Sequence, residues 1–209
     1  MPNTKLVLVL KEFKKSVQDS LDIANKATQY KELRKGKYRQ ISKPILYSLN
    51  ELSFLKLFIS WEHFLEQSFI RFMCGAKNSA GFPKETYANP KSLEHALSML
   101  KQKQRYVDWT IVSDVIERAR LYFQNGEPFS TALGQASTYL TEMKTIRNRI
   151  VHESKKAEEE FHDLVRQKFG HLPRGMVPGK LLMSNFSANK TLLEQYEIVV
   201  LTVAETLVG

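Results

Sequence analysis

Arg147 and His152 stand five residues apart, and their side chains are of the types that bind anions and exchange protons. Around them, apolar residues recur every three or four positions, which predicts a helix. At about 100° per residue, Arg147 falls inside the apolar stripe of that helix, which consists of Leu133, Ala136, Leu140, Met143 and Ile150. Because a guanidinium cannot lose its charge, a core-facing arginine needs an anion or a partner chain beside it.

Uncharged polar residues form a second stripe on the same predicted helix. They are Thr141, Thr145, Asn148 and His152, spaced by four, three and four residues. A polar seam that ends in an imidazole is typical of an interface or a cleft rather than of a fully solvated surface. The sequence therefore predicts that this stretch lines a polar site.

The run Arg147-Asn148-Arg149-Ile150-Val151-His152 resembles the signature of the HEPN superfamily, the higher eukaryotes and prokaryotes nucleotide-binding fold. That signature is an Arg, four to six residues and a His, often with a polar residue directly after the Arg. The aromatic stretch Trp61-Glu62-His63-Phe64-Leu65-Glu66 also resembles the helix that precedes the motif in bacterial HEPN-like nucleases. The resemblance covers roughly residues 40–170 in layout, and only the short motif is specific.

The resemblance implies a metal-independent endoribonuclease that needs no cofactor. It implies a homodimer whose motif helices face each other across a twofold axis, with the active cleft between them. There the RNA 2′-hydroxyl would attack the adjacent phosphate and leave a 2′,3′-cyclic phosphate. His152 would transfer protons, Arg147 would bind the phosphate, and Asn148 would orient either group. Because Arg147 and His152 lie about 140° apart on one helix, we expect two facing helices to bring such groups together.

Three basic residues near the motif are candidates for contacts to RNA phosphates: Arg149, Lys155 and Lys156. The alternative is a solvated basic face that Glu158, Glu159 and Glu160 balance. Glu62 is a candidate support for Arg147, and the alternative is a purely structural ion pair between these two residues. His152 has an alternative role too, as a cap at the C-terminal end of its helix.

A second Arg-x4-His match, Arg166 to His171, is discounted, because Gly170 and Pro173 end the helix there and leave no rigid support. The family resemblance further implies a toxin or defence component, with an antitoxin or a neighbouring gene's product as partner. Some such toxins carry a Tyr two residues after the His, as a site of inactivation. Here Ser154 stands there, so we do not expect that control. The alternative function is a non-catalytic module of the same fold that binds RNA, nucleotide or protein.

Composition limits the other function classes. The 209 residues carry 31 Lys and Arg against 22 Asp and Glu, a net charge of +9, which attracts polyanions such as RNA. The single cysteine, Cys74, excludes an internal disulfide and a thiolate zinc site. No glycine-rich phosphate loop, His-Glu-x-x-His pair or Gly-x-Ser-x-Gly elbow is present. The apolar run Leu6 to Leu10 is too short to span a membrane, so we expect a cytoplasmic protein without membrane contact.

Helical spacing recurs almost everywhere, and no period-2 strand is evident. We predict helices from Leu6 to the basic run at Gly36, from Pro44 to Gly75, from Ser92 to Lys101, from Asp108 to Phe123, from Pro128 with Ser130 as cap to Ile150, and from Leu192 to Leu207. Lys155 to Phe169 is predicted either as a continuation of the preceding helix or as a separate helix. Residues 76–91 and 170–187 are predicted as loops. The predicted fold is one all-α domain over residues 1–209, a helical bundle. The family resemblance implies that this bundle is of the HEPN type with extra peripheral helices.

Overall fold

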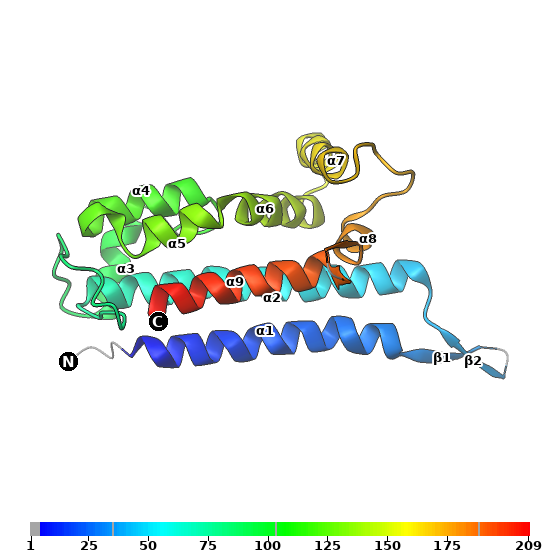
Figure 1. The fold of residues 1–209 in the computed structure, drawn as a ribbon, viewed down its shortest axis with the longest axis horizontal. Coiled ribbons are helices and arrows are strands. Elements are labelled where there is room, and N and C mark those ends of the chain that lie inside the picture. Colours follow the sequence, from blue (N-terminus) through cyan, green and yellow to red (C-terminus); the bar gives the residue numbers. More distant parts are fainter. Residues whose placement is uncertain (1–4, 35, 103, 188) are drawn as a thin grey trace. The chain divides into compact units, whose positions relative to one another are not determined.

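The computed structural model describes residues 5–34, 36–102, 104–187 and 189–209, and it is mostly helical (Figure 1). In chain order the elements are α1 (Leu6–Gln29), β1 (Lys31–Arg34), β2 (Lys37–Gln40), α2 (Lys43–Met73), α3 (Leu93–Lys101), α4 (Val112–Tyr122), η1 (Gln124–Gly126), α5 (Phe129–Gln135), α6 (Ser137–Val151), α7 (Lys155–Phe169), α8 (Pro178–Leu182), β3 (Asn185–Ser187), β4 (Lys190–Thr191) and α9 (Leu192–Val208). The strands form two antiparallel hairpins, β1–β2 and β3–β4.

The described chain divides into two compact units, and each draws residues from the long helices. Unit 1 holds residues 5–14, 60–141 and 199–209, and unit 2 holds residues 15–59 and 142–198. The prediction of a single domain over residues 1–209 stays a prediction.

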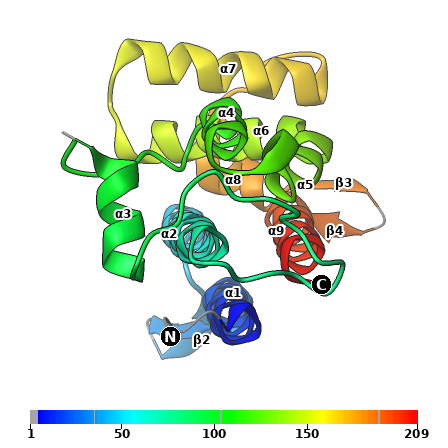
Figure 2. The same cartoon turned by 90° about the vertical axis from the view of Figure 1, so that its left-hand side faces the viewer.

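The core of unit 1 is built from aromatic rings of α2 and the segments that follow it. Phe69 of α2 lies 4.9 Å from both Phe123 and Phe129, measured between ring centroids. Phe13 of α1 stacks on Phe64 of α2, with 4.7 Å between the centroids. Figures 1 and 2 agree that the first turns of α1 and the last turns of α9 run along this part of α2. In this part of α2 the side chains of Trp61, Phe64 and Phe69 are all buried and form core.

In the core of unit 2, α2 packs against α9, and the short helix α8 packs against α2. Phe54 of α2 faces Tyr196 of α9 with 6.1 Å between the ring centroids, and both residues are buried. Gly179 in the first turn of α8 lies so close to α2 that any side chain there would collide with the backbone of Tyr47. Its backbone N–H donates to Glu51 Oε1 at 2.8 Å. This bond satisfies one of the free N–H groups at the start of α8.

Most of the predicted helices are present with bounds within a few residues, but the first ends at Gln29 rather than at Gly36, and the one predicted from Pro128 to Ile150 is divided into α5 and α6. α2 begins one residue before Pro44 and ends two before Gly75. The predicted helix from Ser92 is α3, and the Ser92 hydroxyl accepts from the backbone N–H of His95. α7 is a separate helix capped by Ser154, whose hydroxyl accepts from the N–H of Ala157.

Several local predictions are wrong. The chain does contain strands. β1 and β2 are short and polar, so they lack the alternation of apolar residues by which a strand is recognised in a sequence. The predicted loop 170–187 is interrupted by α8 and β3. α4 begins at Val112 rather than at Asp108, whose carboxylate instead accepts from the N–H of Thr110. Ser130 caps no helix, since its buried hydroxyl makes no hydrogen bond.

Candidate functional site

The motif residues lie at the C-terminal end of α6, in unit 2. Arg147 and Asn148 belong to the last turns of this helix, which ends at Val151. His152 is the first residue beyond it, and its backbone N–H still donates to the carbonyl of Asn148 at 2.9 Å. The imidazole is therefore held at a helix end and exposed to solvent.

The three predicted catalytic side chains meet within one chain. Arg147 Nη1 lies 3.2 Å from Asn148 Oδ1 and 3.4 Å from His152 Nε2. The 140° separation expected on one helix therefore does not keep Arg147 and His152 apart within one chain, and the facing helices of a homodimer stay a prediction. The 140° separation applies only inside a helix, whereas His152 lies past the end of α6 and its side chain turns back toward the long arginine.

Arg147 is half-buried rather than directed into the core. The buried face of α6 is formed by Leu140, Met143 and Ile146, and Ile150 is only half-buried. Arg147 flanks this face, which leaves its guanidinium within reach of the polar seam. The seam is also partly accessible, with Thr145 and Asn148 half-buried and Thr141 and His152 exposed.

A buried ion pair fixes α6 against α7 and α9. Lys168 Nζ of α7 lies 2.6 Å from Glu142 Oε2 of α6, and the side chains are 15% and 11% exposed. The same carboxylate oxygen accepts from the hydroxyl of Tyr196 of α9 at 3.0 Å. Sequence reasoning missed this network, because its members come from three helices. The one sequence feature that could have indicated this network is the position of Glu142 beside Met143, at the border of the buried face of α6.

The three candidate RNA-binding residues are all accessible, but to different degrees. Lys155 and Lys156 at the start of α7 are 88% and 85% exposed. They reach Glu159 and Glu160 at 3.7 and 3.9 Å, pairs that contribute little at an open surface. Arg149 on α6 is half-buried. The two lysines are thus free to turn toward a polyanion, at little cost in lost ion pairing.

Two further sequence-based expectations concern residues outside this contact. Glu62 is half-buried in α2 and belongs to unit 1, so its support of Arg147 stays a prediction. The discounted match engages other partners: Arg166 donates to Asp163 at 2.6 Å, and His171 Nδ1 lies 3.1 Å from the Phe169 carbonyl. Gly170 between them ends α7 in the left-handed conformation.

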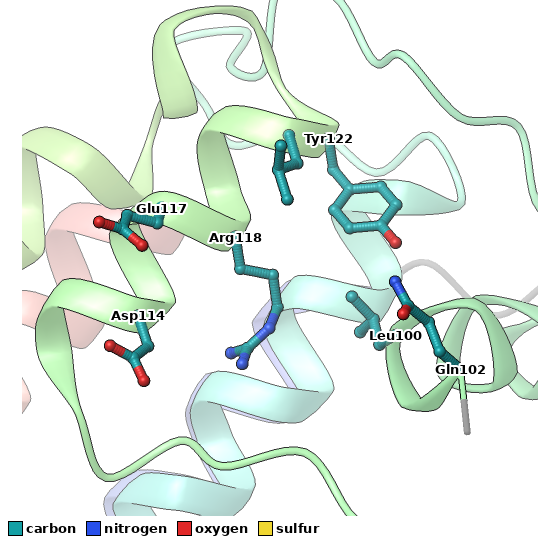
Figure 3. A pocket seen from close by; sticks show the side chains of 7 residues that line it. Leu100, Gln102, Asp114, Glu117, Arg118 and Tyr122 are labelled. Atoms are coloured by element: carbon teal, nitrogen blue, oxygen red, sulfur yellow. The ribbon is translucent and has the colours of Figure 1, made fainter. Parts of the chain in front are cut away.

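A pocket of about 290 Å³ lies between α3 and α4 in unit 1. Figure 3 shows Arg118 at its centre, with Asp114 and Glu117 to one side and Tyr122, Leu100 and Gln102 to the other. The Arg118 guanidinium lies 5.0 Å from the centre of the Trp109 ring and donates to the Asp108 carbonyl. Burial lowers the pKa of Arg118, and Asp114 and Asp108 partly oppose that shift. No residue predicted to do chemistry lines this pocket.

Comparisons with known proteins give no assignment. No family model matches the chain, and neither a curated protein nor a solved structure matches it significantly. Among the described residues, no three His, Cys, Asp or Glu side chains gather in a way that could hold a metal ion. In the same part of the chain, no helix has the length and hydropathy that a membrane crossing requires.

Proposed function

We propose that the protein is a metal-independent endoribonuclease of the HEPN type. The observation that supports this is the contact of Arg147 Nη1 with both His152 Nε2 and Asn148 Oδ1 at the exposed end of α6. It brings a permanent cation, a proton-exchanging ring and an orienting amide to one point. Such a set suits a reaction in which a phosphate is bound and two protons move.

The reaction is an internal transesterification of RNA. The 2′-oxygen attacks the adjacent phosphorus, the bond to the 5′-oxygen breaks, and the products are a 2′,3′-cyclic phosphate and a 5′-hydroxyl. His152 Nε2 takes the 2′-hydroxyl proton, and Arg147 stabilises the extra charge on the phosphoryl oxygens. A second imidazole must give a proton to the leaving 5′-oxygen.

We propose that the second imidazole comes from another copy of the chain. In a homodimer whose α6 ends face each other, His152 of the partner subunit supplies this proton. Arg149, Lys155 and Lys156 border the same end of α6 and contact neighbouring phosphates. Such an enzyme acts in the cytoplasm as a toxin or defence component, restrained by an antitoxin or another neighbouring-gene partner.

The decisive experiment incubates the purified chain with end-labelled single-stranded RNA in the presence of EDTA and analyses the 3′ ends. We expect 2′,3′-cyclic phosphate ends from the wild type. His152→Ala and Arg147→Ala should lower the cleavage rate by roughly 100- to 10,000-fold. Circular dichroism spectra should be unchanged, because His152 is exposed and Arg147 half-buried.

The chain provides its own matched control for this assay. Arg166 and His171 repeat the Arg-x4-His spacing at the end of α7, so Arg166→Ala with His171→Ala should cleave within about twofold of wild type. Equal cleavage by the wild type and the His152 variant would refute the proposal. Binding of RNA with no cyclic-phosphate product would favour the non-catalytic module instead.

A further inference from the structure

The segment between α1 and α2 carries nearly half of the net charge of the chain. From Tyr30 to Ser42 the sequence holds five Lys or Arg residues against one Glu, a net +4, whereas all 209 residues carry +9. The described part of this segment forms β1 and β2, and Gly36 in the turn takes a positive φ of 71°. Such a concentration of one sign of charge attracts a polyanion.

Tyr38 and two of the cations of the hairpin lie on opposite faces, whereas Lys31 shares the face of Tyr38 and Glu32 shares the face of Arg39. Leu33 pairs with Tyr38 across the two strands, so both lie on one face. Lys37 and Arg39 flank Tyr38 and therefore lie on the opposite face. A short two-stranded ribbon thus presents a ring on one side and two cations on the other.

Both faces of the described hairpin are accessible. Every residue of β2 is exposed, and Tyr38 and Leu33 are 75% and 64% exposed. Figure 1 shows the hairpin extending past the ends of α1 and α2 from which it continues. The Tyr38 ring and the Leu33 side chain are therefore accessible to a ligand.

We propose that the β1–β2 hairpin is an arm that binds single-stranded RNA. Tyr38 stacks on a base, and Lys37 and Arg39 contact phosphates on the adjoining backbone. This combination favours an unpaired strand, whose bases are accessible, over a duplex, whose base faces are stacked away. The choice of RNA rests on the proposed function, but the binding itself requires no cleavage.

The test measures binding of a fluorescein-labelled mixed-sequence RNA by anisotropy, using the full-length His152→Ala protein so that the RNA stays intact. We expect Tyr38→Ala to weaken binding roughly 5- to 150-fold. Tyr38→Phe, which keeps the ring, should bind within about twofold of the parent. Lys37→Ala with Arg39→Ala should reduce the slope of log affinity against log salt by about 0.7 for each phosphate that the variant no longer neutralises.

A matched control removes two charges elsewhere. Lys11 and Lys91 are exposed in unit 1, so Lys11→Ala with Lys91→Ala has the same net charge as the hairpin double variant. If both double variants weaken binding equally, the effect is one of total charge and the arm is refuted. Unchanged affinity in Tyr38→Ala would refute it as well. If Tyr38→Ala changes the oligomeric state and leaves the RNA affinity unchanged, the hairpin is a protein interface and the RNA-binding arm is refuted.

The two proposals fail separately. Loss of binding in the hairpin variants with no cyclic-phosphate product from the wild type would support the arm and refute the nuclease. Cleavage by the wild type with unchanged binding in the hairpin variants would support the nuclease and refute the arm.

Discussion

The Arg147 guanidinium and the His152 imidazole of one chain contact each other, with Nη1 3.4 Å from Nε2. Because arginine stays protonated, the guanidinium donates and Nε2 accepts. In the proposed reaction the guanidinium turns to the phosphate, which frees the lone pair of Nε2 for the 2′-hydroxyl proton. The contact in the free protein thus holds the base beside the group that we propose binds the phosphate.

Asn148 is the residue whose substitution should separate positioning from binding. Its Oδ1 accepts from Arg147 Nη1 at 3.2 Å, so Asn148→Ala releases the guanidinium from one of its partners. We expect kcat to fall by roughly 10- to 100-fold while KM stays within about twofold. Asn148→Asp retains the acceptor but adds a negative charge, so it should mainly raise KM for RNA. A rise in KM alone for Asn148→Ala would contradict the positioning role.

Mixing subunits tests whether each cleft needs His152 from two protomers. Wild type and His152→Ala are combined in equal amounts, and their subunits are allowed to exchange. If only dimers with two imidazoles cleave, the rate should fall to about a quarter of that of wild type at the same total concentration. If each chain acts alone, it should fall only to about half. An equal mixture of wild type and Arg166→Ala should keep the full rate.

The sequence predicts those features that depend on local spacing. The buried stripe of α2, which includes Phe54, Phe69 and Phe72, follows from apolar residues three and four apart, and α3 begins directly after Ser92, where the sequence predicts a helix start. The β1–β2 hairpin could not be predicted from apolar spacing, because both of its faces are exposed and neither needs to be apolar.

The site could be predicted in its residues but not in its geometry. The contact between Arg147 and His152 depends on where α6 ends, and helix ends are uncertain by a few residues in any sequence-based prediction. The pairing of Glu142 with Lys168 depends on how α6 and α7 pack, which no local spacing encodes. Long-range packing thus decides what the motif residues can do.

The Glu142–Lys168 pair should contribute strongly to stability. Lys168→Met leaves a carboxylate with 11% side-chain exposure without its cation, and we expect the free energy of unfolding to fall by about 3 kcal/mol. Adding Glu142→Leu should recover most of that loss, because the unpaired charge is then removed. The matched control is Lys155→Met, which breaks an exposed pair and should cost less than about 0.5 kcal/mol. Equal losses in the two lysine variants, measured by urea unfolding, would contradict this.

Glu197 on α9 should make stability depend on pH. Burial raises the pKa of its carboxyl, the neighbouring Glu194 raises it further, and Lys190 partly opposes the shift. Because folding raises this pKa, the folded state binds the proton more tightly than the unfolded chain does. The resulting contribution to stability is fully present below the ordinary pKa near 4.5, and it is lost as the pH rises through the folded pKa. Glu197→Gln should therefore melt at a higher temperature than wild type at pH 7.5, and at the same temperature at pH 3.5. Glu85→Gln, which removes an exposed charge, should show no such pH-dependent difference. A Glu197→Gln protein that melts below wild type at pH 7.5 would show that the ionised carboxylate stabilises the fold.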